Sequence, residues 1–226
     1  MNRPAAALPL AVLISGRGSN MLAIARACVT GEIHARIVSV ICDRADAAGI
    51  QAAAASGLPT QLLEARGLPR AGFEARLAQT LSASGAQLVA LAGFMRILSA
   101  TFVAPWAGRM LNIHPSLLPD YPGLDTHRRV LAAAAREHGA SVHFVTQELD
   151  AGPLICQGRL SIAPGDTQAS LAARVHRLEH RIYPMVIGLI ADGRLALSGS
   201  TVVLDGRPLA APLQVSEDGS LDPTDA

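Results

Sequence analysis

The stretch PLAVLISGRGSN, residues 9–20, decides the fold. Its apolar run predicts a buried strand, Gly16 and Gly18 end that strand in a tight loop, and a helical pattern at 21–29 follows at once. Continuous apolar strands joined by helices predict an α/β fold, with an open, mostly parallel twisted sheet and helices on both faces. Further strands are expected at 35–42, 59–65, 86–93 and 109–114, and further helices at 46–56, 73–84, 99–105 and 125–136.

After residue 139 the pattern changes to one typical of an antiparallel C-terminal part. A long helix is predicted there, and because proline cannot donate a backbone hydrogen bond, we expect it to be interrupted or kinked at Pro184. The expected elements are strands at 140–146 and 152–162, the helix at 167–192, and a hairpin at 195–209 that turns at Asp205-Gly206.

The domain organisation is expected to be simple. We predict one domain over residues 1–210, without repeats or an internal linker. Residues 211–226 are acidic and poor in hydrophobic side chains, so this tail is expected to be disordered.

Composition excludes several classes of protein. A net charge of +1 over 226 residues argues against a general nucleic-acid or membrane-surface binder, which would carry a basic excess. The apolar runs are too short to span a membrane. The three cysteines, Cys28, Cys42 and Cys156, are an odd number and widely spaced, which favours small buried side chains in a reducing compartment. We therefore predict a cytoplasmic protein.

The loop after the first strand is a candidate phosphate site. Gly16 and Gly18 let the backbone approach a ligand, and the following helix directs free N–H groups towards an anion. Ser19 and Asn20 are expected to cap that helix. A dinucleotide site is an alternative because Asp43 ends the second strand, although the third glycine of that fingerprint is missing, and a simple tight turn is another.

Polar side chains also mark the end of the strand at 109–114. Asn112 and His114 are two residues apart, so both project from the same face, and Pro115 ends the strand directly after them. Asp150 stands in a turn further along the chain. An amide, an imidazole and a carboxylate suit acyl transfer to an amine, because the first two stabilise an oxyanion and the third stabilises the imidazolium. The alternative is an Asn-His pair that only satisfies backbone groups and an Asp that only forms a turn.

Several motifs occur in the order found in one enzyme family. LISGRGSN, LAGFMRIL, LNIHPSLLPDYPG, THRR, SVHFVTQELDAGP and RVHRLEHRIYP resemble the folate-dependent phosphoribosylglycinamide formyltransferases over about residues 10–210. The resemblance implies a formyltransferase-like variant of the Rossmann fold, with a phosphate-binding half at about 8–105 and a folate and catalytic half at about 106–210. It also implies that 10-formyltetrahydrofolate, a cosubstrate, gives its formyl group to the primary amine of glycinamide ribonucleotide in purine biosynthesis.

The resemblance assigns roles to individual residues. Asn112, His114 and Asp150 match the family's catalytic triad. Residues matching the ribonucleotide site are Gly18, Ser19, Asn20, His176 and Glu179. Residues matching the folate site are Arg70, Met95, Arg96, Ile97, Leu98, Thr146, Gln147, Glu148, Leu149 and Asp150. Small-molecule substrates are thus expected, without nucleic acid, membrane or metal, in a monomer or a homodimer.

Other functions fit the sequence less well. HRLEH, residues 176–180, fits a zinc-binding pattern, but a third ligand downstream is lacking apart from Glu217 in the tail. A non-catalytic nucleotide sensor would not need Asn112, His114 and Asp150 together. Within the superfamily, a methionyl-tRNA formyltransferase would need a basic C-terminal domain, a formyltetrahydrofolate hydrolase would need an N-terminal regulatory domain, and a sugar-amine formyltransferase is the remaining alternative. The other histidines, His34, His127, His138 and His143, show no ligand spacing, and surface or core roles are expected for them. His127 is the exception to test, because it is close in sequence to the predicted folate loop.

Overall fold

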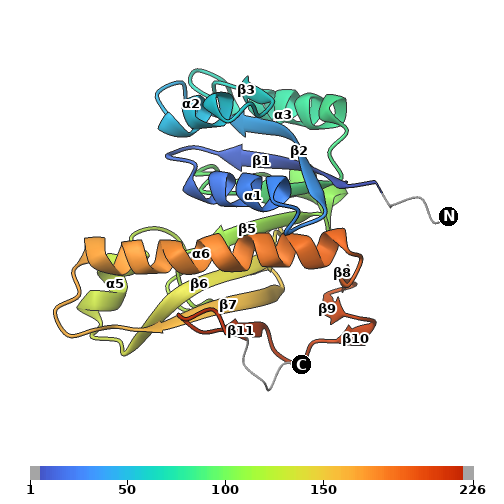
Figure 1. The fold of residues 1–226 in the computed structure, drawn as a ribbon. Helices are drawn as coiled ribbons and strands as arrows, with labels where there is room; N and C mark the ends of the chain where they lie inside the picture. Colours follow the sequence, from blue (N-terminus) through green and yellow to red (C-terminus); the bar gives the residue numbers. More distant parts are fainter. Residues whose placement is uncertain (1–5, 221–226) are drawn as a thin grey trace.

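The computed structural model describes residues 6–220, and its central feature is one eight-stranded sheet (Figure 1). Its strands are β1 (Leu8–Ile14), β2 (Ala35–Cys42), β3 (Thr60–Leu62), β4 (Leu88–Leu91), β5 (Met110–His114), β6 (Glu137–Phe144), β7 (Leu154–Ser161) and β11 (Leu213–Val215). They lie in the order β11-β7-β6-β5-β4-β1-β2-β3, and only β6 runs antiparallel to its two neighbours. The predicted mostly parallel α/β sheet is confirmed.

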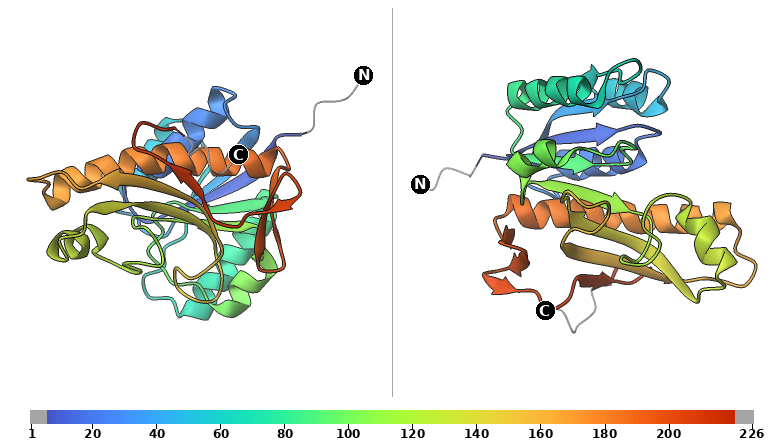
Figure 2. Two further views of the ribbon diagram at one scale, coloured as in Figure 1. Left: turned by 90° about the horizontal axis from the view of Figure 1, so that it is seen from below. Right: turned by 180° about the vertical axis from the view of Figure 1, so that it is seen from behind.

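Helices cover both faces of the sheet (Figures 1 and 2). They are α1 (Ser19–Val29), α2 (Ala48–Ala55), α3 (Arg70–Ser84), α4 (Ala100–Val103), α5 (Thr126–Ala132) and α6 (Gln168–Ala191), with a short 3-10 helix, η1 (Ala104–Trp106), after α4. The alternate side chains of β1 enter two separate cores: Leu10, Val12 and Ile14 pack with α1 and α6, whereas Ala11 and Leu13 pack with α3 and α4. A strand buried on both faces must be apolar throughout, which explains the unbroken hydrophobic run.

A second, three-stranded sheet follows α6. It consists of β8 (Leu195–Ser198), β9 (Thr201–Leu204) and β10 (Arg207–Pro208), which pair antiparallel in chain order. Leu204 pairs with Arg207 across the turn at Asp205-Gly206, so the predicted hairpin is confirmed.

The prediction for α5 was wrong at its C-terminal end. The helix stops at Ala132 instead of residue 136, and Ala134 has a positive φ of 49°. Glu137 already begins β6, where it pairs with Ser161 of β7. Sheet hydrogen bonds therefore replace the helical pattern that the local sequence favours.

Of the two outcomes predicted at Pro184, the interruption of the long helix is wrong, whereas the kink stays a prediction. α6 runs without a break from Gln168 to Ala191 with Pro184 inside it. Pro184 is buried among other buried residues of the helix, including Tyr183 and Val186. Packing of this apolar face against the sheet offsets the missing backbone hydrogen bond.

The tail is ordered over the part that the structure describes, which corrects the predicted disorder. Leu213 and Val215 are buried, and β11 pairs parallel with β7. Glu217 forms an ion pair with Arg174 of α6, with 2.6 Å between Oε2 and Nη2. Two apolar side chains in a polar segment are thus enough to cover the open edge of β7. Residues 221–226 lie outside the described residues.

Candidate active site

The glycine loop is packed against the start of α2. Gly18 is the N-cap of α1 with φ 75°, and a Cβ there would lie 3.0 Å from Cα of Gly49. The Gly49 N–H also donates to the carbonyl of Gly16 at 2.9 Å. Glycine is needed at position 18 because of the positive φ and because a Cβ would crowd Gly49. The expectation that Ser19 or Asn20 caps α1 is wrong, because Ser19 is already the first residue of the helix.

Asn20 instead contacts a residue 159 positions away. Its Nδ2 donates to Oε2 of Glu179 at 2.8 Å, and both side chains are buried. Burial raises the pKa of Glu179 to about 7, although the hydrogen bond from Asn20 acts in the opposite direction. Beside the loop after β1, α6 therefore places a carboxyl group, that of Glu179, whose pKa is near neutral pH.

These residues line a pocket of about 470 Å³. All five residues matched to the ribonucleotide site take part in it, namely Gly18, Ser19, Asn20, His176 and Glu179. The same pocket contains Arg17 and Arg44, two cationic groups that the sequence reasoning did not single out. Burial and the nearby Arg17 lower the pKa of His176, so its imidazole is neutral at pH 7. An anion is the ligand that this combination of helix N-terminus and guanidinium groups favours.

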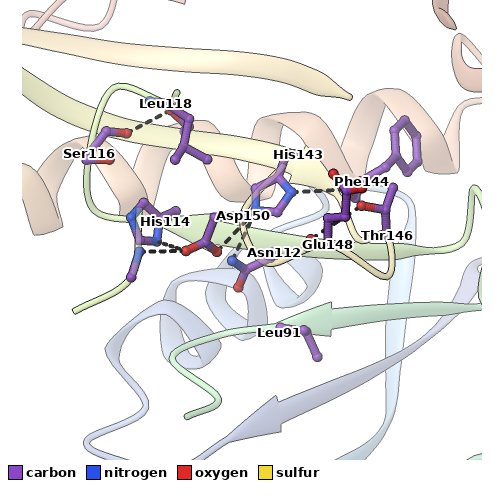
Figure 3. A network of polar contacts seen from close by, with 12 residues as sticks. Leu91, Asn112, His114, Ser116, Leu118, His143, Phe144, Thr146, Glu148 and Asp150 are labelled. Atoms are coloured by element: carbon purple, nitrogen blue, oxygen red, sulfur yellow. Dashed lines mark hydrogen bonds and ion pairs between the residues drawn. The ribbon is translucent and has the colours of Figure 1, made fainter. Parts of the chain in front are cut away.

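Asn112, His114 and Asp150 meet at the carboxyl end of β5 (Figure 3). Nδ1 of His114 lies 3.4 Å from Oδ2 of Asp150, and Nε2 of His114 lies 3.0 Å from the carbonyl oxygen of Tyr121. Since a carbonyl only accepts, Nε2 must carry the proton. Both ring nitrogens of His114 therefore face oxygen atoms.

His143 completes the cluster, and the sequence reasoning missed it. Nε2 of His143 lies 3.1 Å from Nδ2 of Asn112 and 3.9 Å from Oδ1 of Asp150 (Figure 3). Its Nδ1–H donates to the carbonyl of Phe144 at 2.9 Å, and burial lowers its pKa. A neutral ring in this tautomer accepts a hydrogen bond from Asn112. His143 could have been found from its position opposite Asn112 in the neighbouring antiparallel strand. That position is known only once the register of β6 is known.

The turn that carries Asp150 is tightly constrained. Asp150 has a positive φ of 52°, which is uncommon outside glycine. Its Oδ2 accepts the Gly123 N–H at 2.9 Å. Two residues later, a Cβ on Gly152 would lie 1.8 Å from the carbonyl oxygen of Phe144. Only glycine fits there, and the close approach fixes the turn next to β6.

A second pocket, of about 410 Å³, opens beside the triad. Four large apolar side chains lining it are more than half exposed: Met95, Ile97, Leu124 and Leu149. Such a concentration of exposed apolar surface is typical of a ligand site. A smaller adjoining pocket of about 100 Å³ is lined by Leu98 and the loop residues Thr146, Gln147 and Glu148, and Arg96 and Asp150 line both pockets.

Arg70 is separate from these pockets. It lies at the start of α3 and its Nε is 3.1 Å from Oε1 of Glu74. Glu74 in turn accepts hydrogen bonds from the backbone and the hydroxyl of Ser99, the residue after the folate-matching segment. Arg70 is therefore connected to the predicted folate site only indirectly, through Glu74 and Ser99.

The anion pocket and the apolar pocket are parts of one cleft. They share Gly93, Met95, Ile113, Pro115 and His127 in their walls, and the triad lines the apolar side of this junction. Two small molecules bound in the two halves would meet at Asn112, His114 and Asp150. This arrangement suits transfer of a group between them.

The zinc-binding pattern at residues 176–180 does not form a metal site in the described part of the chain. His176 and His180 stack on α6 with ring centroids 6.4 Å apart. Within residues 6–220 no group of three or more His, Cys, Asp or Glu side chains is arranged to hold a metal ion. No helix in the same range is long and apolar enough to cross a membrane.

Fold and site together define a formyl transferase: the family model of that description matches residues 8–187. Comparison with individual proteins narrows this class. The chain is 47% identical over 201 residues to phosphoribosylglycinamide formyltransferase of Escherichia coli strain K12, covering 88% of this chain and 95% of that one. It is 51% identical to the solved phosphoribosylglycinamide formyltransferase of Coxiella burnetii, with a TM-score of 0.86 over 90% of this chain and 96% of that one. The chain belongs to the phosphoribosylglycinamide formyltransferase family.

A more distant relative shares the architecture. Formyltetrahydrofolate deformylase of Burkholderia mallei superposes with a TM-score of 0.80 at 27% identity, covering 87% of this chain and 69% of that one. The fold is thus common to enzymes of different names, and the acceptor depends on the residues of the site.

Proposed function

We propose that this enzyme transfers the formyl group of 10-formyltetrahydrofolate to the primary amine of glycinamide ribonucleotide. The observation that carries the proposal is the position of the triad, at the junction of an anion pocket and an apolar pocket. The ribonucleotide offers a phosphate for the loop at Gly18 and an amine at its other end. The aminobenzoyl ring of the folate is flat and has apolar faces, which suit the pocket with exposed Met95, Ile97, Leu124 and Leu149.

In the reaction, the neutral amine attacks the formyl carbon and forms the new C–N bond. Negative charge then develops on the formyl oxygen. Asn112 and the imidazolium of His114 stabilise that charge, and Asp150 stabilises the imidazolium. The bond between the formyl carbon and N10 of the folate breaks, and the proton that the amine loses moves to N10 through His114 or a water beside Asp150. No nucleophilic side chain is needed, because the amine itself is the nucleophile.

His143 orients this centre. As a neutral acceptor it holds one N–H of Asn112, which leaves the second N–H of the same amide for the formyl oxygen. Positioning of both substrates in one cleft supplies much of the remaining acceleration, since well-oriented reactions gain roughly 7–11 kcal/mol.

The cysteines support a cytoplasmic setting for the enzyme. Among residues 6–220 they form no disulfide, and Cys42 and Cys156 are buried. Thiols that stay reduced suit the cytoplasm, where we expect the enzyme to work.

The acceptor is tested by direct competition between amines. Purified enzyme with 10-formyltetrahydrofolate is offered glycinamide ribonucleotide, an amino sugar nucleotide, or water alone, and tetrahydrofolate release is followed. We expect turnover with the ribonucleotide alone. Faster transfer to the amino sugar, which is the alternative acceptor, would contradict the proposal, as would hydrolysis without any amine.

A further inference from the structure

A pair of histidines lies at the junction of the two pockets and has no part in the mechanism above. His127, the second residue of α5, lines both the anion pocket and the apolar pocket. Its Nδ1 is 2.9 Å from Nε2 of His138 on β6, and the two rings meet edge to face. One nitrogen of this pair must donate and the other accept.

His138 decides which of them donates. It is 1% exposed, and its Nδ1 is buried without a hydrogen-bond partner among the described residues. Burial lowers the pKa of His138 to about 4, so the ring is neutral at pH 7. A buried N–H without a partner is rarer than a buried acceptor without one. The single proton of His138 is therefore on Nε2, where it has an acceptor.

The tautomer of His127 follows from that assignment. Its Nδ1 accepts the hydrogen bond, and because burial also lowers the pKa of His127, this ring too is neutral. The remaining proton must be on Nε2, which makes no hydrogen bond to the described residues. His127 thus brings an uncharged N–H donor to the wall shared by the two pockets.

We propose that this donor binds the amide carbonyl oxygen of the glycinamide arm, and that His138 is a positioning residue that fixes its tautomer. The inference rests on the proposed function. In the ribonucleotide, the amide carbonyl lies between the phosphate, which the Gly18 loop holds, and the amine, which must reach His114. The shared wall, where His127 lies, is the matching stretch of the protein. An acceptor of the same length without this carbonyl would leave the N–H unpaired, so His127 contributes to specificity.

The first test separates the amide from the phosphate. His127→Phe removes the donor but keeps a planar ring, and His127→Gln restores an N–H. We expect His127→Phe to raise the KM for glycinamide ribonucleotide about tenfold with kcat nearly unchanged, and His127→Gln to recover most of the loss. Ribose 5-phosphate, which lacks the amide, should inhibit wild type and His127→Phe equally. The proposal would be overturned if His127→Phe weakened inhibition by ribose 5-phosphate as much as it raised the KM for the ribonucleotide. An unchanged KM would overturn it as well.

The second test locates the ring proton of His127 by spectroscopy and needs no activity measurement. Nitrogen-15 NMR of the wild-type enzyme at pH 7 should show Nε2 of His127 protonated and Nδ1 unprotonated. His138→Leu should mix the two tautomers of His127 and raise the KM for the ribonucleotide, whereas His138→Gln, which keeps a donor, should not. A proton on Nδ1 of His127 in the wild type would refute the inference even if both substitutions prevent folding. Because this spectrum needs no substrate, it stands apart from the acceptor assay: inactivity of the wild type towards the ribonucleotide would refute the proposed function instead.

Discussion

Asn112 and His143 face each other across the antiparallel pair of β5 and β6, and Nδ2 of Asn112 lies 3.1 Å from Nε2 of His143. The same imidazole is 3.9 Å from Asp150, so a residue outside the predicted triad contacts two of its members. β6 is the one strand of the large sheet that runs against its neighbours, and this reversal brings His143 to the end of β5.

Removal of His143 should disturb Asn112 without removing a group that contacts the formyl oxygen. We expect His143→Ala to lower kcat by about tenfold or more, because the Asn112 amide loses its buried acceptor and rotates. His143→Gln, which offers a carbonyl oxygen at similar reach, should be milder. Steady-state kinetics with both substrates give the measurement, and equal rates for wild type and His143→Ala would show that Asn112 needs no such support.

Asp150→Asn tests the charge beside His114. The amide still accepts the Gly123 N–H, so the turn is retained, but the negative charge that stabilises the imidazolium is lost. We expect kcat to fall by about 10²–10⁴-fold, with the KM for the ribonucleotide changed little. Isothermal titration with the ribonucleotide checks the second part. Undiminished turnover would exclude Asp150 from the mechanism.

Glu179 should make stability depend on pH in a defined direction. In the folded state the pKa of Glu179 is about 7, above the ordinary value of 4.5 for a glutamate, so between pH 4.5 and 7 the folded state holds a proton that the unfolded state has lost. The stabilisation is therefore complete below about pH 4.5 and is lost as the pH rises towards 7. Glu179→Gln removes this titration and keeps a neutral, hydrogen-bonding side chain beside Asn20.

Urea unfolding of wild type and Glu179→Gln at several pH values provides the measurement. The difference between the two free energies of unfolding should change by a few kcal/mol from pH 4.5 to 7, with wild type losing relative stability. Taking the difference matters because His138, whose pKa is lowered to about 4, acts in the opposite direction. A difference that is flat over this range would contradict the raised pKa of Glu179.

Two glycine substitutions compare a crowded position with an open one. Gly152→Ala would bring a methyl group to 1.8 Å from the Phe144 carbonyl oxygen, so we expect a loss of more than ~2 kcal/mol in stability and a large loss of activity. Gly72→Ala, inside α3, meets only Cδ of Pro69 at 3.9 Å and should stabilise the enzyme by ~0.5–1 kcal/mol. Thermal denaturation of both variants ranks them. Equal melting temperatures would show that the Asp150 turn relaxes freely.

Much of this protein could be predicted from the sequence, because local physics dictated it. The apolar runs predicted the parallel strands, the glycine loop predicted a pocket after β1, and the alternation of Asn112 and His114 placed both on one face at the end of β5. Thr167 and Ser170 form the capping box that starts α6 where the sequence predicts it.

Only the tertiary structure decided the rest, since it depended on pairing between distant segments. The end of α5, the ordered β11 and the unbroken α6 follow from contacts with the sheet that outweigh local preferences. The register of β6 placed His143 opposite Asn112, and the packing of α6 on α1 placed Glu179 against Asn20. A side chain's period along its own strand or helix is visible in a sequence, but the neighbour it meets across a strand pair is set by the fold.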